Sequence, residues 1–140
     1  MKKSVLFIAF SLLIISCPKG PGVYDANIDI YYKTNTGNNL LDDNVQNHYS
    51  RGQIRFFNLI NGRKYELYRN ILINTDSLNN NYISLAIEAD TTILQLNESI
   101  SDTIVCQIDR SSGISIKKVW YNRLLKWESY AVPRVFTILK

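Results

Sequence analysis

IRFFNLINGRKYELY, residues 54–68, is the stretch that decides the fold. Two runs that favour β-strands, Ile54 to Ile60 and Arg63 to Tyr68, flank the pair Asn61-Gly62. Asparagine and glycine both tolerate the positive φ angles of a type I′ turn, so this pair predicts a two-residue hairpin. The turn fixes the register, because Ile60 must then lie opposite Arg63 and every further pair follows.

The two faces of this hairpin differ in character. The register places Phe56, Asn58 and Ile60 on one face, which we expect to point into the core. The opposite face carries two large apolar side chains, Phe57 and Leu59. A strand face exposed to solvent normally carries polar residues, so these two side chains are expected to be covered by another part of the chain or by a partner. We interpret that face as a candidate interaction surface made of Arg55, Phe57, Leu59 and Tyr68.

An alternative is that the chain covers this face itself. The segment before the hairpin is polar and rich in turn-forming residues around the pair Leu40-Leu41, which predicts a long loop pinned by the two leucines. In this alternative the part from Leu40 to Tyr49 folds back as a lid over Phe57 and Leu59. The sequence leaves both hypotheses open.

The rest of the chain repeats the same pattern of short strands and turns. Strict alternation of apolar and polar residues is clearest from Tyr24 to Lys33. Spacings of about ten residues and the absence of a helical period predict an all-β, immunoglobulin-like antiparallel β-sandwich of about seven to nine strands. The other predicted strands are Ile71–Ile73, Tyr82–Ala89, Thr92–Asn97, Thr103–Asp109, Ile116–Tyr121, Leu124–Glu128 and Val135–Leu139.

A second hairpin is predicted about Asn122-Arg123. A two-residue turn here places Lys117 opposite Glu128, as an ion pair, and Lys118 opposite Trp127. Arginine is strained at positive φ, which favours a longer turn.

Cys106 shares a strand face with Ile104 and Ile108, so we expect a buried, unreactive thiol.

The first residues, MKKSVLFIAFSLLIISC, are typical of a secretory signal. Lys2 and Lys3 precede an apolar run that is too short to span a bilayer, and Ile14-Ile15-Ser16-Cys17 resembles the lipobox of bacterial lipoproteins. That resemblance implies cleavage after residue 16 and a diacylglyceryl group on Cys17. Residues 17–23 then form a flexible tether and residues 24–140 a single domain. The competing interpretation, a buried N-terminal helix, lacks a cap.

Charge and composition exclude several classes of function. The net charge of the whole chain is +4, and without Lys2 and Lys3 it is about +2, with no basic run that would mark a nucleic-acid partner. His48 is the sole histidine and lies in a polar loop, which disfavours a catalytic triad or a zinc site. Asp42-Asp43-Asn44 lacks the spacing and glycine of a calcium loop. We therefore predict no enzyme activity, metal or cofactor.

Four segments of the chain are Thr36–Asp42, Thr91–Leu96 continuing to Asp102-Thr103-Ile104, Val119–Asn122 and Phe136–Lys140. Together they resemble a loose group of small outer-membrane lipoproteins of anaerobic gut Gram-negative bacteria. The chain departs from that group at Asn39, where an aspartate is usual, and at Arg123, where a glycine is usual. The resemblance implies location and fold and brings no activity with it.

Three Asp-Ser/Thr sequences resemble the general O-glycosylation motif of the same bacteria. They would place glycans on Ser77, Thr91 and Thr103, all expected at turns or strand edges. The alternative is that aspartate before serine or threonine is simply favourable turn chemistry.

Two functions remain. One is a non-enzymatic binding or interaction module of the cell envelope, with a protein or glycan partner. The other is a structural or accessory lipoprotein without a small ligand. Pro18 follows Cys17 and no acidic run resembling a surface-export signal does, which favours the periplasmic face of the outer membrane over the cell surface.

Overall fold

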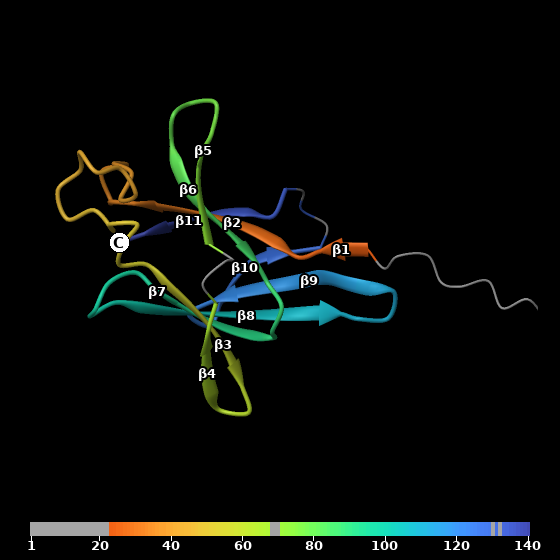
Figure 1. Cartoon of the computed structure of the whole chain (residues 1–140). Helices are drawn as coiled ribbons and strands as arrows, with labels where there is room; N and C mark the ends of the chain where they lie inside the picture. The colour runs from red at the N-terminus through yellow and green to blue at the C-terminus, as the bar shows by residue number, and fades with distance from the viewer. Residues whose placement is uncertain (1–22, 68–70, 130, 132) are drawn as a thin grey trace, which may run out of the picture.

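The computed structural model describes residues 23–67, 71–129, 131 and 133–140. Eleven strands and no helix occupy this part of the chain (Figure 1). The all-β prediction is therefore confirmed, with more strands than expected. The strands are β1 (Val23–Asp25), β2 (Asn27–Lys33), β3 (Arg55–Ile60), β4 (Arg63–Glu66), β5 (Ile71–Thr75), β6 (Asn81–Ala86), β7 (Thr91–Gln95), β8 (Ser101–Asp109), β9 (Gly113–Tyr121), β10 (Leu124–Glu128) and β11 (Val135–Leu139).

The strands form two mixed sheets. The larger sheet has the order β1-β9-β8-β7-β3-β4, with β10 also paired to β9, and the smaller sheet has the order β11-β2-β6-β5. Two pairs, β1 with β9 and β11 with β2, are parallel, so the expectation of a purely antiparallel arrangement is wrong. Both parallel pairs bring an outer strand beside one that is distant in sequence, and local turn signals carry no information about such partners.

The predicted strand from Tyr24 to Lys33 is divided between the sheets. β1 belongs to the larger sheet and β2 to the smaller one, and the chain changes sheet at Ala26, whose carbonyl accepts a hydrogen bond from the Ile87 amide. A strand that switches sheets closes a corner between two packed layers.

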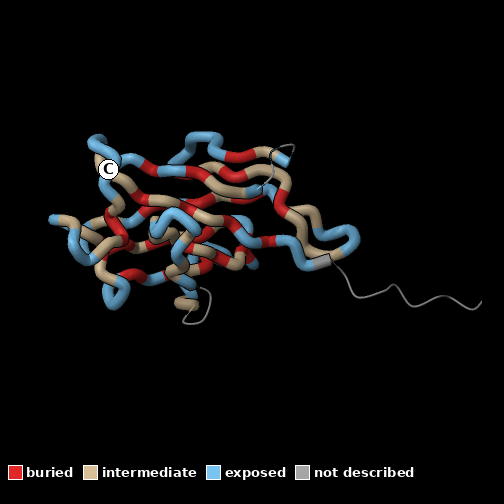
Figure 2. Tube along the Cα trace, turned by 90° about the horizontal axis from the view of Figure 1, so that it is seen from above, coloured by how far each residue is buried: buried red, intermediate tan, exposed pale blue. Residues whose placement is uncertain are grey.

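One hydrophobic core lies between the two sheets, which gives a sandwich-like arrangement. Alternate residues of each strand face it, as the buried segments in Figure 2 show. Tyr32 is fully buried in this core. Its other fully buried large side chains are Phe56, Ile28, Ile30, Ile83, Leu85, Ile87, Leu94, Leu96, Ile104, Ile116 and Val119.

The first hairpin has the predicted turn and register. Asn61 and Gly62 have φ angles of 50° and 76°, and Ile60 pairs with Arg63. Phe56 and Asn58 are buried as expected, whereas Ile60 is 47% exposed. The expectation that the whole face points into the core is wrong at Ile60, because the hairpin tip projects away from the rest of the fold (Figure 1).

The second hairpin has a tighter turn than predicted. Asn122 and Arg123 both have positive φ angles, 47° and 71°, and Leu124 pairs with Tyr121. The turn is held because the Asn122 Oδ1 accepts a hydrogen bond from the Thr103 amide (2.7 Å) and the Asn122 amide donates to the Thr103 carbonyl (2.8 Å). Contacts with β8 thus compensate for the strain at Arg123.

A bulge in β10 changes the pairs farther from this turn. The register shifts between Leu125 and Trp127, so Lys118 rather than Lys117 faces Glu128 and forms an ion pair of 2.5 Å. The predicted contact of Lys118 with Trp127 is also wrong. The guanidinium of Arg134 instead lies over the indole, 5.2 Å from the ring centroid.

The long loop after β2 is pinned by its leucine pair, as predicted. Leu40 and Leu41 are both buried, the Leu40 amide donates to the Tyr32 carbonyl (2.8 Å), and Asn81 Nδ2 donates to the Leu41 carbonyl (3.0 Å). These bonds attach the loop to β2 and β6, in the smaller sheet. Among the residues described, no helix is long and apolar enough to cross a membrane.

Candidate functional site

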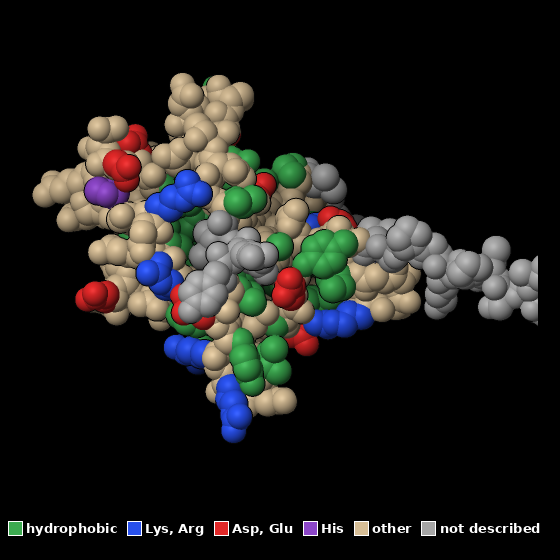
Figure 3. Space-filling model, viewed as in Figure 1, with side chains coloured by type: hydrophobic (Ala, Val, Ile, Leu, Met, Phe, Trp, Pro, Cys, Tyr) green, Lys and Arg blue, Asp and Glu red, His purple; other side chains and the backbone are tan. Residues whose placement is uncertain are grey.

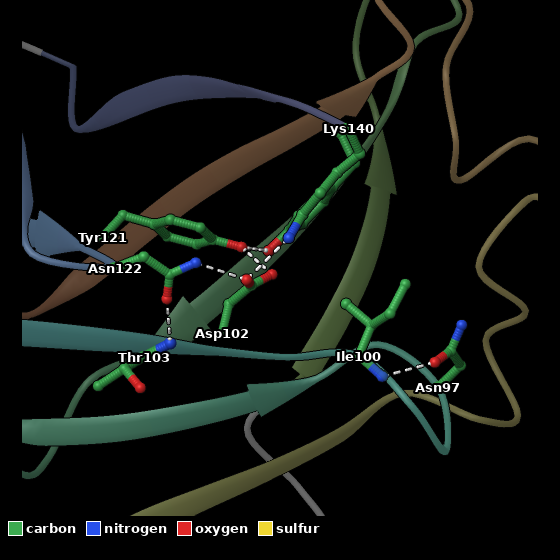
Figure 4. Close-up of polar contacts among 8 residues, drawn as sticks. Asn97, Ile100, Asp102, Thr103, Tyr121, Asn122 and Lys140 are labelled. Atoms are coloured by element: carbon green, nitrogen blue, oxygen red, sulfur yellow. Dashed lines mark hydrogen bonds and ion pairs between the residues drawn. The ribbon is translucent and has the colours of Figure 1, made fainter.

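A buried carboxylate organises one end of the fold. Asp102 in β8 is 2% exposed, and its oxygens accept hydrogen bonds from the Tyr121 hydroxyl and from Asn122 Nδ2 (2.6 Å). Lys140 Nζ lies 2.8 Å from Oδ1 and completes the cluster as an ion pair. Figure 4 shows these side chains converging from β8, β9, the turn after β9 and the residue after β11.

The cluster continues into the core through two tyrosines. The hydroxyls of Tyr32 and Tyr121 lie 2.7 Å apart, which joins β2 of one sheet to β9 of the other. Burial raises the pKa of both hydroxyls well above the ordinary value, so both stay protonated as hydrogen-bond donors. The arrangement is suited to tying two sheets together. A general base must reach a substrate proton, and this carboxylate is enclosed by its own donors.

A surface pocket of ≈ 350 Å³ opens beside this cluster, between β10 and β11. Two apolar side chains on its walls are strongly exposed, Leu124 at 63% and Leu139 at 61%. We call this feature the β10–β11 groove. It is lined by Tyr121, Asn122, Leu124, Lys126, Thr137, Ile138, Leu139 and Lys140.

A second pocket, of ≈ 370 Å³, lies where β1 and β2 pass the start of β9. Arg134 is one of the residues that line this pocket, and its guanidinium makes three contacts within the protein. It forms an ion pair with Asp25, donates a hydrogen bond to the Asn27 carbonyl (2.9 Å) and lies over the Trp127 ring. These contacts neutralise the charge that would attract an anionic ligand.

The outward face of β3 carries the residues predicted as an interaction surface. Phe57 and Leu59 are half-buried, Arg55 Nε lies 3.5 Å from Glu66 Oε1, and Lys64 Nζ lies 5.7 Å from the Phe57 ring centroid. In Figure 3, hydrophobic side chains gather on the β3–β4 hairpin beside Lys and Arg side chains at its tip. The fourth predicted residue, Tyr68, lies outside the described residues.

The lid hypothesis for this face is wrong. Leu40 and Leu41 belong to the core cluster between the sheets, and Phe57 and Leu59 do not. The Phe57 ring is contacted instead from within the same hairpin, by the ammonium of Lys64 as a cation–π pair.

The three glycosylation motifs have different surroundings. Ser77 is exposed in the β5–β6 turn, and Thr91 is half-buried at the start of β7. Thr103 lies inside β8 rather than at a turn. Its side chain is exposed, because neighbouring residues of a strand face opposite sides and Asp102 beside it points into the core. The expectation that all three motifs occupy turns or strand edges is therefore wrong for this one.

The signal in residues 1–16 and residues 17–22 of the predicted tether, Cys17 included, lie outside the described residues. Val23, the last residue predicted for the tether, belongs to β1 instead. His48 Nε2 lies 3.5 Å from Asp43 Oδ1. Within the described ranges no group of three or more metal-ligating side chains comes together.

Neither Asp102 nor Lys140 was predicted to be a site residue. A signal for Asp102 was present, because it shares the strand parity of the inward residues Ile104 and Cys106. Lys140 gave no such signal, since its partner is 38 positions away.

Comparisons of the chain with protein-family models, with curated protein sequences and with solved structures gave no match.

Proposed function

We propose that this chain is a lipid-anchored, non-enzymatic interaction module of the bacterial cell envelope. The lipobox at Cys17, the Pro- and Gly-rich tether after it and the resemblance to small outer-membrane lipoproteins support the anchor. Attachment to the periplasmic face of the outer membrane, with a protein or glycan partner in the envelope, is part of the same proposal.

The β10–β11 groove is the observation that carries the binding role. It exposes Leu124 and Leu139 together beside Lys126, on a domain that buries most of its apolar side chains between two sheets. Contiguous apolar surface rimmed by polar residues is typical of contact sites for other molecules. By contrast, Asp102 is the most buried carboxylate of the described part, and its oxygens already bind Tyr121, Asn122 and Lys140. A carboxylate held in this way is not placed to take a proton from a substrate, which supports a role without catalysis.

Two finer points belong to this proposal. The sandwich-like pair of sheets would be a variant of the immunoglobulin-like architecture with parallel outer pairs. Glycans would be carried at Ser77 and Thr103, whose side chains are exposed, more readily than at half-buried Thr91.

Fractionation of envelopes tests the anchor. We expect the wild-type chain in the outer-membrane fraction with a diacylglyceryl group on Cys17 by mass spectrometry, and the Cys17→Ala variant outside it. An unmodified Cys17, or a Cys17→Ala chain that stays in the membrane, would contradict the anchor.

Crosslinking in intact envelopes tests the binding role. We expect a partner to be recovered with the wild-type chain and lost with Leu124→Ser. Leu78→Ser is the matched control, because Leu78 is 79% exposed on the distant β5–β6 turn. Equal recovery with both variants would place contacts elsewhere, and no specific partner with any of them would favour an accessory lipoprotein without a ligand.

A further inference from the structure

The edge of β11 presents free backbone groups. Asp29 N donates a hydrogen bond to the Arg134 carbonyl (2.9 Å), and Lys140 N donates one to the Lys33 carbonyl (3.0 Å). The Arg134 carbonyl and the Lys140 amide, at the two ends of β11, therefore point toward β2. Alternate residues of a parallel strand bond to the same neighbour, hence the N–H and C=O groups of Thr137 and Leu139 point away from β2. In the part of the chain that the structure describes, no strand pairs with that side of β11.

The opposite wall of the groove is also an edge. Tyr121 and Leu124 close the two-residue turn as a hydrogen-bonded pair. The next residue of β10, Leu125, belongs to a non-hydrogen-bonded pair, so its backbone N–H and C=O face away from β9. β10 and β11 are not paired with one another. The groove therefore separates two strand edges whose exposed side chains, Leu124 and Leu139, are apolar.

The charge at this end of the fold is positive. Lys126 lines the groove and Arg123 stands at the adjoining hairpin tip, both exposed. Neither forms an ion pair with any residue described. Asp102, which contacts the groove residues Tyr121, Asn122 and Lys140, is buried and forms an ion pair with Lys140.

We infer that β11 binds an extended acidic segment of a partner protein as an added strand, which lies in the β10–β11 groove. Backbone groups of Thr137 and Leu139 provide the hydrogen bonds, as in other cases of strand addition to a sheet edge. Alternate side chains of the added strand then contact Leu124 and Leu139, and its carboxylates face Lys126. This inference rests on the proposed interaction function and specifies the partner.

A second copy of the chain fits the edge less well. Pairing β11 with β11 of another copy would bring two sets of Lys126 and Arg123 side chains to one interface, and like charges there oppose association. The uncompensated positive charge selects an acidic segment instead.

Synthetic nine-residue peptides provide the probe, with the full chain kept in detergent. One peptide alternates Glu with Val, and the control peptide alternates Lys with Val. We expect the Glu peptide alone to bind by fluorescence anisotropy, and hydrogen exchange of the Thr137 and Leu139 amides to slow when it does.

Two variants separate backbone from charge. Thr137→Pro removes the outward N–H without touching the ladder to β2, and Thr137→Ala is its control. We expect the Glu peptide to bind Thr137→Pro at least about tenfold more weakly than Thr137→Ala, since a lost hydrogen bond and a proline ring both oppose pairing. Lys126→Glu should weaken binding by about the same factor, whereas Arg63→Glu, the same charge change on the distant β3–β4 hairpin, should not.

Several outcomes would overturn the inference. These are no binding of the Glu peptide, equal binding of the Lys peptide, and equal affinity for Thr137→Pro and Thr137→Ala. Self-association that Thr137→Pro abolishes would assign the edge to a second copy. In each case, a crosslinked partner lost with Leu124→Ser would leave the proposed interaction function standing, so the two failures are distinguishable.

Discussion

Lys140 Nζ lies 2.8 Å from Asp102 Oδ1, so the residue after β11 in the smaller sheet is tied to β8 in the larger one. Asp102 is nearly inaccessible to water, whereas the Lys140 side chain keeps about a quarter of its surface exposed. An ion pair in such a place is screened weakly by salt, and its loss leaves the buried partner uncompensated.

Removal of this lysine should destabilise the fold. We expect Lys140→Met to lower the free energy of unfolding by about 3 kcal/mol, because the Asp102 carboxylate then stays buried with only Tyr121 and Asn122 as donors. Lys126→Met removes the same charge from an exposed site and should change it by less than about 0.5 kcal/mol. Chemical denaturation measures both, and equal effects would show that the ion pair contributes nothing.

Phe56 and Phe57 are neighbours on β3 that face opposite sides. Phe56 is fully buried in the core, and Phe57 is half-buried under Lys64. We expect Phe56→Ala to cost about 4 kcal/mol of stability and Phe57→Ala about 1 kcal/mol. Similar losses in thermal or chemical unfolding would mean that the outer face of β3 is a covered core position.

Cys106 should be inert in the native protein. Its side chain is 3% exposed, and burial, with a smaller effect of the nearby Asp90 carboxylate, raises the pKa of the thiol to about 12. We expect a thiol reagent to leave Cys106 unmodified in the Cys17→Ser variant until denaturant is added, as measured by intact mass. Rapid labelling of the folded chain would contradict this placement.

Asp76 should make the β5–β6 turn sensitive to acid. Its Oδ1 accepts hydrogen bonds from the amides of Asn80 and Leu78, and these, with the Tyr31 hydroxyl, lower the pKa of the carboxyl. A folded-state pKa below the unfolded one means that the unfolded chain binds more protons, so this stabilisation is present above about pH 4 and lost as pH falls further.

The measurement compares melting temperatures across pH. We expect wild type to exceed Asp76→Asn at neutral pH and the difference to shrink progressively as pH falls below about 4. Glu98→Gln, which removes an exposed carboxylate from a different turn, is the control for the change in net charge. A constant difference between wild type and Asp76→Asn would mean that the charge is not what holds the turn.

Local sequence signals determined the elements of this fold. Asn61-Gly62 specified its hairpin and register, because only residues that tolerate positive φ make that turn. Alternation placed Phe56 and Cys106 inside, since the strand period of two admits only one inward set. The leucine pair Leu40-Leu41 likewise had to be buried to hold a polar loop.

Only the tertiary structure decided how these elements meet. The parallel pairing of β11 with β2 and the Lys140–Asp102 ion pair join parts of the chain that no local pattern relates. Within the predicted β9–β10 hairpin, a bulge that the turn signal did not indicate moves Lys118 opposite Glu128. The β10–β11 groove depends on the pairing of β11 with β2 and on the Lys140–Asp102 ion pair, because it lies where the edges of the two sheets come together. The sequence by itself determined the inward set of residues in strands such as β2, β7 and β8, because a strand alternates sides with a period of two. Long-range packing determined which strand edges stay open, and it left Ile60 exposed at a hairpin tip.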